Sequence, residues 1–199
     1  METRKYSAYS PNLGRTKEVR VYGTGGLSLI AFPTQDGMAD QWEGFGMIDT
    51  LREWLETEQI RLFTVDTVDV RTWSNKHARK DFRTRMQESY FRWFVEEAVP
   101  MVREINPDPR LPLLTGCSMG GAHCAAALLR RKSIVLCCGQ GKGEDIELDA
   151  TRILEKDLID NDIPAWVDYW GTDVDHDWVW WKPQLRYFLP YVLDEINHR

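Results

Sequence analysis

The chain has 199 residues, with 25 Lys and Arg against 31 Asp and Glu, and 43% of its residues are hydrophobic. This length suits a single domain, residues 1–199, with a sizeable core, and the composition excludes an intrinsically disordered protein. The net charge of −6 argues against nucleic acid as the main partner, because phosphate binding favours a basic surface.

The sequence also gives expectations about location and metals. No apolar run approaches the ~18 residues of a membrane span, and the polar N-terminus does not resemble a signal peptide. The four cysteines lack the spacing of metal ligands, and the last two are adjacent: Cys117, Cys124, Cys137 and Cys138. We therefore expect free buried thiols, a cytoplasmic location, no membrane partner, and neither a metal nor a cofactor.

Short apolar runs alternate with longer amphipathic stretches in the first half of the chain. The alternating segment 17–22 indicates an antiparallel edge strand, and the runs at 27–32 and 60–65 predict buried strands. Apolar residues at helical spacing predict a helix over 39–58. A second, longer helix is predicted over 79–105, and Pro100 is expected to kink or end it.

The second half continues the same alternation. It predicts short strands at 111–114, 133–138 and 165–170, and helices at 119–131, 147–161 and about 180–196, the last with Pro183 near its first turn. Strands alternating with helices predict an α/β protein, a three-layer αβα sandwich with a mostly parallel sheet. In such folds the chemistry lies at the carboxyl ends of the strands.

One motif at such a strand end carries chemistry. Residues 116–120 read Gly-Cys-Ser-Met-Gly, which matches G-x-S-x-G, and they lie between the strand at 111–114 and an alanine-rich helix. That pattern is typical of a strained turn that exposes a nucleophilic serine, here Ser118. The alternative is a glycine-lined turn around an inert buried serine.

A serine hydroxyl needs a general base, and the chain has four histidines. His176 follows the last predicted strand and precedes the final helix, which favours it as the base. His123 lies on the helix after Ser118, and we expect it to point into packing. His77 falls in a charged loop, and His198 lies at the C-terminus.

A carboxylate should orient the base and stabilise the imidazolium. Glu144 and Asp145 both follow the strand at 133–138 through a glycine-rich turn, and we prefer Asp145 slightly. Asp173, Asp175 and Asp177 lie so close to His176 in sequence that we expect them to shape its loop or to remain solvated instead.

The oxyanion that develops during acyl transfer needs two backbone donors. The N–H of Met119, directly after the nucleophile, is one candidate. The second is expected from the loop after the strand at 27–32, with the Gln35 or Asp36 amide favoured. Asp40, Asp66 and Asp69 are interpreted as strand-end caps, because no His or Cys accompanies them at ligand spacing.

Taken together, these segments resemble the α/β-hydrolase esterases related to esterase D, feruloyl esterases and enterochelin esterases. The resemblance covers most of the chain and rests on residues 9–14, 21–23, 32–34, 46–47, 65–69, 96–100, 116–120 and 176–178 with Trp181. It implies a serine hydrolase with nucleophile Ser118, base His176, and Asp145 or Glu144 as the acid.

One departure from the family concerns the segment after Arg131. The family places a further strand and a cap between the nucleophile helix and the acid-bearing strand, and this chain has too few residues there for either. The leading hypothesis is therefore a serine ester hydrolase, with an open site, that acts on short acyl or on sugar or aromatic esters. We expect it to form a homo-oligomer. The alternatives are acyl transfer to an alcohol, or a non-catalytic relative with a misaligned triad that acts in binding or assembly.

Overall fold

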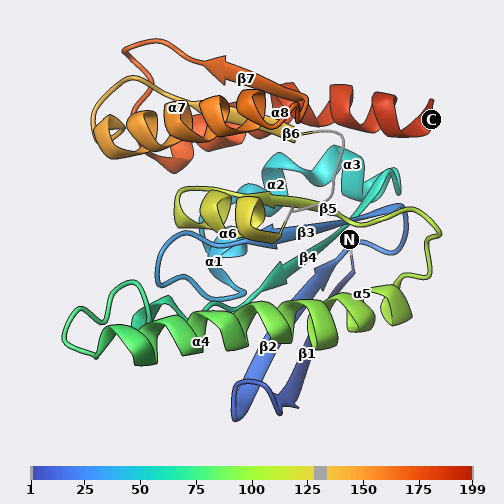
Figure 1. The fold of residues 1–199 in the computed structure, drawn as a ribbon. Coiled ribbons are helices and arrows are strands. Elements are labelled where there is room, and N and C mark those ends of the chain that lie inside the picture. The colour runs from blue at the N-terminus through green and yellow to red at the C-terminus, as the bar shows by residue number, and fades with distance from the viewer. Residues whose placement is uncertain (1, 128–133, 199) are drawn as a thin grey trace. The chain divides into compact units, whose positions relative to one another are not determined.

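The computed structural model describes residues 2–127 and 134–198. These residues form two compact units, Met1–Leu128 and Leu129–Arg199, and each is described by itself (Figure 1). The expectation that residues 1–199 form one domain stays a prediction.

The N-terminal unit contains a mixed five-stranded sheet. Its order is β1-β2-β4-β3-β5, and its strands are β1 (Thr3–Ser10), β2 (Arg15–Tyr22), β3 (Leu27–Phe32), β4 (Ile60–Val65) and β5 (Leu113–Gly116). β3 pairs in parallel with β4 and β5, whereas β2 pairs antiparallel with β1 and β4. The expected strand at 17–22 is therefore antiparallel as predicted, but its place at the edge is wrong, because β1 lies outside it. β1 gave no apolar signal, since most of its side chains are exposed.

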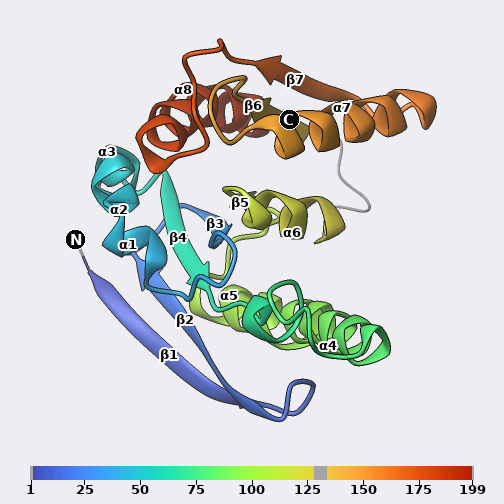
Figure 2. The ribbon, with the colours of Figure 1, turned by 90° about the vertical axis from the view of Figure 1, so that its left-hand side faces the viewer.

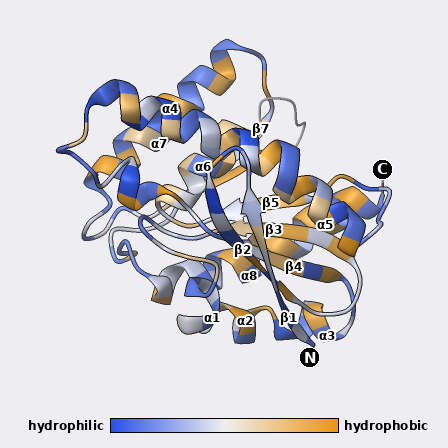
Figure 3. Ribbon diagram, turned by 90° about the horizontal axis from the view of Figure 1, so that it is seen from below, coloured by the Kyte–Doolittle hydropathy of each residue, from blue (hydrophilic) through white to orange (hydrophobic). Residues whose placement is uncertain are grey.

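Helices cover both faces of this sheet. Side chains that alternate along β2, β3 and β4 pack with α4 (Lys80–Trp93), the π-helical turn η2 (Phe94–Ala98) and α5 (Val99–Ile105) in one core. Figure 2 shows these helices and α6 (Met119–Ala127) on one side of the sheet. On the other side lie the short helices α1 (Gln41–Gly44), α2 (Met47–Thr50) and α3 (Arg52–Glu56). The hydrophobic colouring of β3 contrasts with the hydrophilic β1–β2 hairpin (Figure 3). This unit is thus layered as the sequence predicts.

The single helix predicted over 39–58 is wrong. The segment forms three short helices, α1 (Gln41–Gly44), α2 (Met47–Thr50) and α3 (Arg52–Glu56). Gly46 has φ +73°, a left-handed backbone that a continuous helix cannot contain. The apolar side is nevertheless buried as its spacing predicts, with Trp42 and Leu51 fully covered.

The long helix predicted over 79–105 is confirmed in extent, but it does not end at Pro100. Proline cannot donate a backbone hydrogen bond, and its ring crowds the preceding turn. The π-helical turn η2 lies immediately before α5 and widens the helix at that point, so the chain continues to Ile105.

The C-terminal unit pairs β6 (Ile134–Cys138) with β7 (Ala165–Tyr169) in parallel, and it contains α7 (Asp145–Asp160) and α8 (Trp178–Asn197). Ser133, the predicted first residue of β6, and the predicted end of the helix at 119–131 lie outside the described residues. α8 begins earlier than predicted because Asp177 caps it by accepting from the Val179 N–H, so Pro183 lies inside the helix and not in its first turn.

Among the helices of the described ranges, none combines the length and apolar character that a bilayer crossing requires. The four cysteines are free thiols, as expected. Cys124 and Cys138 are buried, whereas Cys117 and Cys137 are half-buried.

Candidate active site

The turn between β5 and α6 holds Ser118 in a left-handed conformation with φ +55°. Non-glycine residues rarely adopt this conformation, and such strain is concentrated at functional sites. A Cβ on Gly116 would lie 2.3 Å from the Gly120 carbonyl oxygen, so any larger residue at the first glycine of the motif would clash with the backbone. The strand–turn–helix context predicted for a nucleophilic serine is therefore present.

The second glycine brings the start of α6 against the end of β3. A Cβ on Gly120 would lie 2.5 Å from the carbonyl oxygen of Phe32 and 2.6 Å from that of Pro33. The Gly120 and Gly121 N–H groups donate to Cys117 and Ser118 within the turn. In the described part of the chain the Met119 N–H donates to no protein acceptor.

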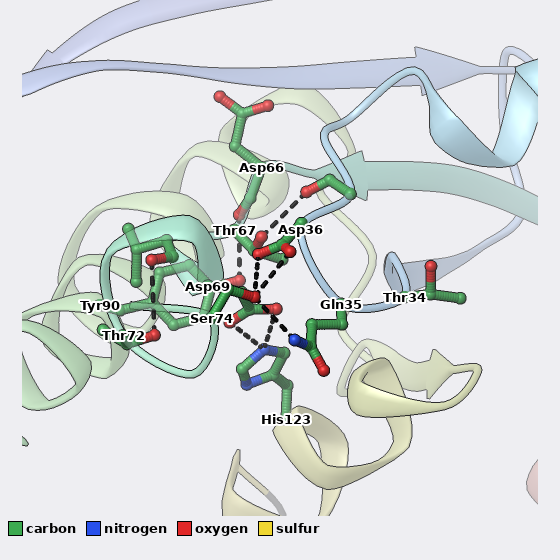
Figure 4. Close-up of polar contacts among 12 residues, drawn as sticks. Thr34, Gln35, Asp36, Asp66, Thr67, Asp69, Thr72, Ser74, Tyr90 and His123 are labelled. Carbon is green, nitrogen blue, oxygen red and sulfur yellow. Dashed lines mark hydrogen bonds and ion pairs between the residues drawn. The ribbon is translucent and has the colours of Figure 1, made fainter. Parts of the chain in front are cut away.

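The loop after β3 is fixed by a side-chain network that Figure 4 shows. Ser74 donates its hydroxyl to the Asp36 carboxylate at 2.6–2.7 Å and accepts from the Gln35 side chain at 2.7 Å. Asp36 has φ +61°. Over the described residues, neither the Gln35 nor the Asp36 backbone N–H donates to a protein acceptor. Both amides therefore remain available to a ligand.

A buried pair links the nucleophile helix to the loop that carries Ser74. The Nε2 of His123 lies 3.1 Å from Asp69 Oδ1, and the two side chains are 2% and 0% exposed (Figure 4). The Asp69 carbonyl accepts from the Ser74 N–H. His123 also contacts the ring of Tyr90, so its predicted packing role is confirmed. The sequence does not predict this contact, since Asp69 and His123 lie 54 residues apart.

Of the other acidic residues at the strand ends, Asp66 acts as a cap, as expected, whereas the Asp40 side chain makes no cap hydrogen bond. Asp66 accepts from the backbone N–H groups of Glu18 and Ala39, and Lys17 Nζ lies 3.9 Å from its carboxylate. Burial lowers the pKa of Lys17. Asp40 lies on the surface, 3.6 Å from Arg20.

In the C-terminal unit, two loops after β6 and β7 are joined by backbone hydrogen bonds. Gly141 donates to the Val174 carbonyl at 2.9 Å, and His176 donates to the Lys142 carbonyl at 3.0 Å. A Cβ on Gly139 would lie 2.2 Å from the Val174 carbonyl oxygen, so the approach of the two loops depends on that glycine. Asp175 accepts from the Lys142 N–H, which confirms its predicted role in shaping the loop.

This loop pair brings His176 against Glu144. The His176 Nδ1 lies 3.1 Å from Glu144 Oε2, and Glu144 is only 4% exposed. The buried Cys138 thiol donates to the same oxygen at 3.6 Å. Asp145, which the sequence slightly favours as the acid, is exposed as the first residue of α7, and the carboxylate that contacts His176 is that of its neighbour Glu144.

The contact with Glu144 determines the state of the imidazole. An ionised carboxylate only accepts hydrogen bonds, so the proton of neutral His176 stays on Nδ1 and Nε2 becomes the acceptor. The hydrogen bond to Glu144 raises the pKa of His176, with smaller electrostatic contributions from Glu144, Glu147 and Asp177, although burial opposes the shift. The ring of Trp181 packs edge-on against the imidazole at 5.0 Å.

Glu147 completes a cluster of possible ligand atoms. One atom each from Glu144, Glu147 and His176 lies within 4.8 Å of the others, the one such group that the described residues contain. Glu147 was not predicted as a site residue, although its spacing of three from Glu144 on a helix could have indicated a shared face.

Comparison with solved structures places this fold among esterases. A ferulic acid esterase is similar with 12% sequence identity and a TM-score of 0.70, and the match covers 97% of both chains. An S-formylglutathione hydrolase from Agrobacterium tumefaciens is similar with 12% identity and a TM-score of 0.70, over 96% of this chain and 94% of that one. The ferric enterobactin esterase of Salmonella typhimurium is similar with 15% identity and a TM-score of 0.65, over 98% of this chain and 60% of that one. No protein-family model matches the chain. A search of curated proteins likewise finds no match.

The chain therefore has an α/β-hydrolase fold similar to that of these esterases, and the resemblance inferred from the sequence is confirmed at the level of the fold. Because the identities are 12–15%, activity has to be argued from the site itself.

Proposed function

We propose that the protein is a serine carboxylic-ester hydrolase. The observation that carries the proposal is the left-handed Ser118 in its strand–turn–helix setting. The His176–Glu144 pair supports it, because a carboxylate that accepts from Nδ1 makes Nε2 the nitrogen that can take a proton from a nucleophile. The esterases of similar fold add support.

In the proposed reaction, Ser118 Oγ attacks the ester carbonyl carbon while His176 Nε2 takes the hydroxyl proton. The resulting imidazolium returns that proton to the leaving alcohol as the carbon–oxygen bond breaks, which gives an acyl-enzyme. Water then attacks the acyl carbon by the same route and releases the acid. Glu144 holds the ring and stabilises its positive charge during both halves.

Backbone amides are proposed to stabilise the oxyanion. The Met119 N–H is one donor, and the Gln35 or Asp36 N–H is the other. Support comes from the placement of Gly120 against Pro33, which joins the two donor segments, and from the Ser74 network that fixes the second one.

Labelling with a fluorophosphonate tests this function against a non-catalytic binding role. An activated serine reacts rapidly and stoichiometrically, and peptide mapping should place the adduct on Ser118. Absence of labelling in a folded protein would favour the binding role. Acyl transfer, the other alternative, would show as ester exchange with added alcohol at the expense of hydrolysis.

The carboxylate assignment gives a paired prediction. Glu144→Gln should lower kcat/KM by about 10²- to 10⁴-fold, because the amide no longer stabilises the imidazolium, whereas Asp145→Asn should have a mild effect. Steady-state kinetics with p-nitrophenyl acetate measure both variants. Two mild defects would point to another carboxylate, such as Asp173 or Asp175.

A second prediction concerns the connection between α6, described to Ala127, and β6, which starts at Ile134. Because this segment is too short to form a cap over the acyl pocket, we propose an open site with a shallow pocket. kcat/KM should then decline from acetyl to longer p-nitrophenyl esters. A rate that rises with chain length would contradict the open pocket.

We also propose a homo-oligomer. Apolar edges left without a covering strand commonly drive association. Within the described sheet of the N-terminal unit, β5 has β3 as its one strand neighbour. Size-exclusion chromatography with light scattering measures the mass, and a clean monomer would contradict this proposal.

A further inference from the structure

Glu147 lies beside the nitrogen of His176 that Glu144 does not hold. Its Oε1 is 3.9 Å from Nε2, and the side chain is 37% exposed. Across the described ranges, no Lys or Arg forms an ion pair with Glu147, so its charge faces solvent and the imidazole.

In the proposed reaction, a carboxylate next to Nε2 lies close to the alcohol part of the ester. Nδ1 is engaged with Glu144, so Nε2 is the atom that protonates the departing alcohol oxygen. The alcohol part of the ester must therefore pass within a few ångströms of Nε2, and so within reach of the Glu147 carboxylate.

The position of Glu147 in its helix favours an acidic residue even without a ligand. Acidic residues in the first turn of a helix interact favourably with its dipole, and Glu147 lies in the first turn of α7 together with Asp145. That explains an acidic residue at this position. It does not explain why the side chain points to His176, whereas Asp145 is exposed and makes no such contact.

Within the described residues of the C-terminal unit, the charged groups that act on the imidazole are acidic. Glu144, Glu147 and Asp177 all act on His176, and Asp175 lies in the same loop. Lys142 contributes its backbone groups to the loop pair, and its side chain is exposed. A negative substrate group near Nε2 would be repelled, whereas a cation would be attracted and would stabilise the exposed carboxylate.

From this geometry we infer that Glu147 is a specificity-determining residue that selects esters whose alcohol part carries a positive charge. The inference rests on the proposed function. The ligand class is an ester of an ammonium-bearing alcohol, with the cation placed two or three bonds from the ester oxygen so that it reaches the carboxylate.

A matched pair of esters tests this inference. Acetylcholine carries a quaternary ammonium, and 3,3-dimethylbutyl acetate is its uncharged isostere of the same shape. Each is measured both as a substrate by pH-stat titration and as a competitor of p-nitrophenyl acetate hydrolysis, so slow turnover does not hide a difference in binding. The variants are Glu147→Gln and, as control, Asp149→Asn, which removes the same charge from α7 at a residue 3.7 Å from Arg152 and 78% exposed.

The wild-type protein and Asp149→Asn should both prefer acetylcholine by about tenfold, and Glu147→Gln should bring the ratio close to one. Added salt should reduce the wild-type preference. A wild-type ratio near one, or a ratio that Glu147→Gln leaves unchanged, would overturn this inference and leave the proposed function standing. Failure to hydrolyse p-nitrophenyl acetate together with failure of fluorophosphonate labelling would instead remove the proposed function, and this inference with it.

Discussion

Ser118→Ala should lower ester hydrolysis by at least about 10⁴-fold and abolish fluorophosphonate labelling, while the protein stays folded. Removing the nucleophile of a serine hydrolase costs several orders of magnitude in kcat. Alanine at φ +55° keeps the same backbone strain as serine, so the melting temperature should change little. Turnover of p-nitrophenyl acetate and the intact mass after labelling are the measurements.

Ser7→Ala provides the matched control, because Ser7 is an exposed residue of β1, away from the turn. It should label and hydrolyse like the wild-type protein. Unchanged turnover by pure Ser118→Ala would show that the activity, or the assignment of the nucleophile, lies elsewhere.

His176→Ala should cause a loss of comparable size, and the wild-type pH profile should identify the same residue. A base must be neutral to accept the proton, so kcat/KM falls as the pH drops through the pKa of His176. Because Glu144 raises that pKa, the acid limb should lie above the ordinary imidazole value of about 6.5. Glu144→Gln removes the largest cause of the shift and should move the limb to lower pH in its residual activity.

His123→Ala is the control for His176→Ala, because it should affect the stability of the fold and not the catalytic step. It leaves the fully buried Asp69 carboxylate without its hydrogen-bond partner, which should destabilise the fold by about 1–3 kcal/mol. Activity per folded molecule should nevertheless stay far above that of His176→Ala. Thermal melts and kinetics measured together distinguish the two effects. An acid limb that persists in an active, folded His176→Ala protein would mean that another group is the base.

Short, mostly apolar runs allowed two strands to be predicted to the residue. β3 and β4 are buried at every position, so their apolar runs begin and end where the strands do. β1 could not be predicted in this way because its side chains face solvent. The helix over 39–58 was predicted as continuous because periodicity reports the buried side and does not register the left-handed Gly46.

The candidate site, like the fold, could be predicted from the sequence only where its residues have a local pattern. The motif around Ser118 and the loop of His176 could be proposed from the sequence because each has a local pattern, and their catalytic roles stay predictions. The choice between Glu144 and Asp145 was not, because adjacent residues at a helix start point in different directions and only the backbone decides which one is buried. The Asp69–His123 pair depends on a contact between distant segments, which has no local signature.

The left-handed turn at Ser118 has a consequence for how this chain could change over generations. Glycine adopts that conformation without the penalty of roughly 1–2 kcal/mol that an L-residue bears there. Under the proposed function, the chemistry requires a serine at this position although glycine would be the more stable residue there. Selection for thermal stability alone would replace Ser118 by glycine, so the codon for residue 118 is where selection for durability and selection for chemistry act in opposite directions.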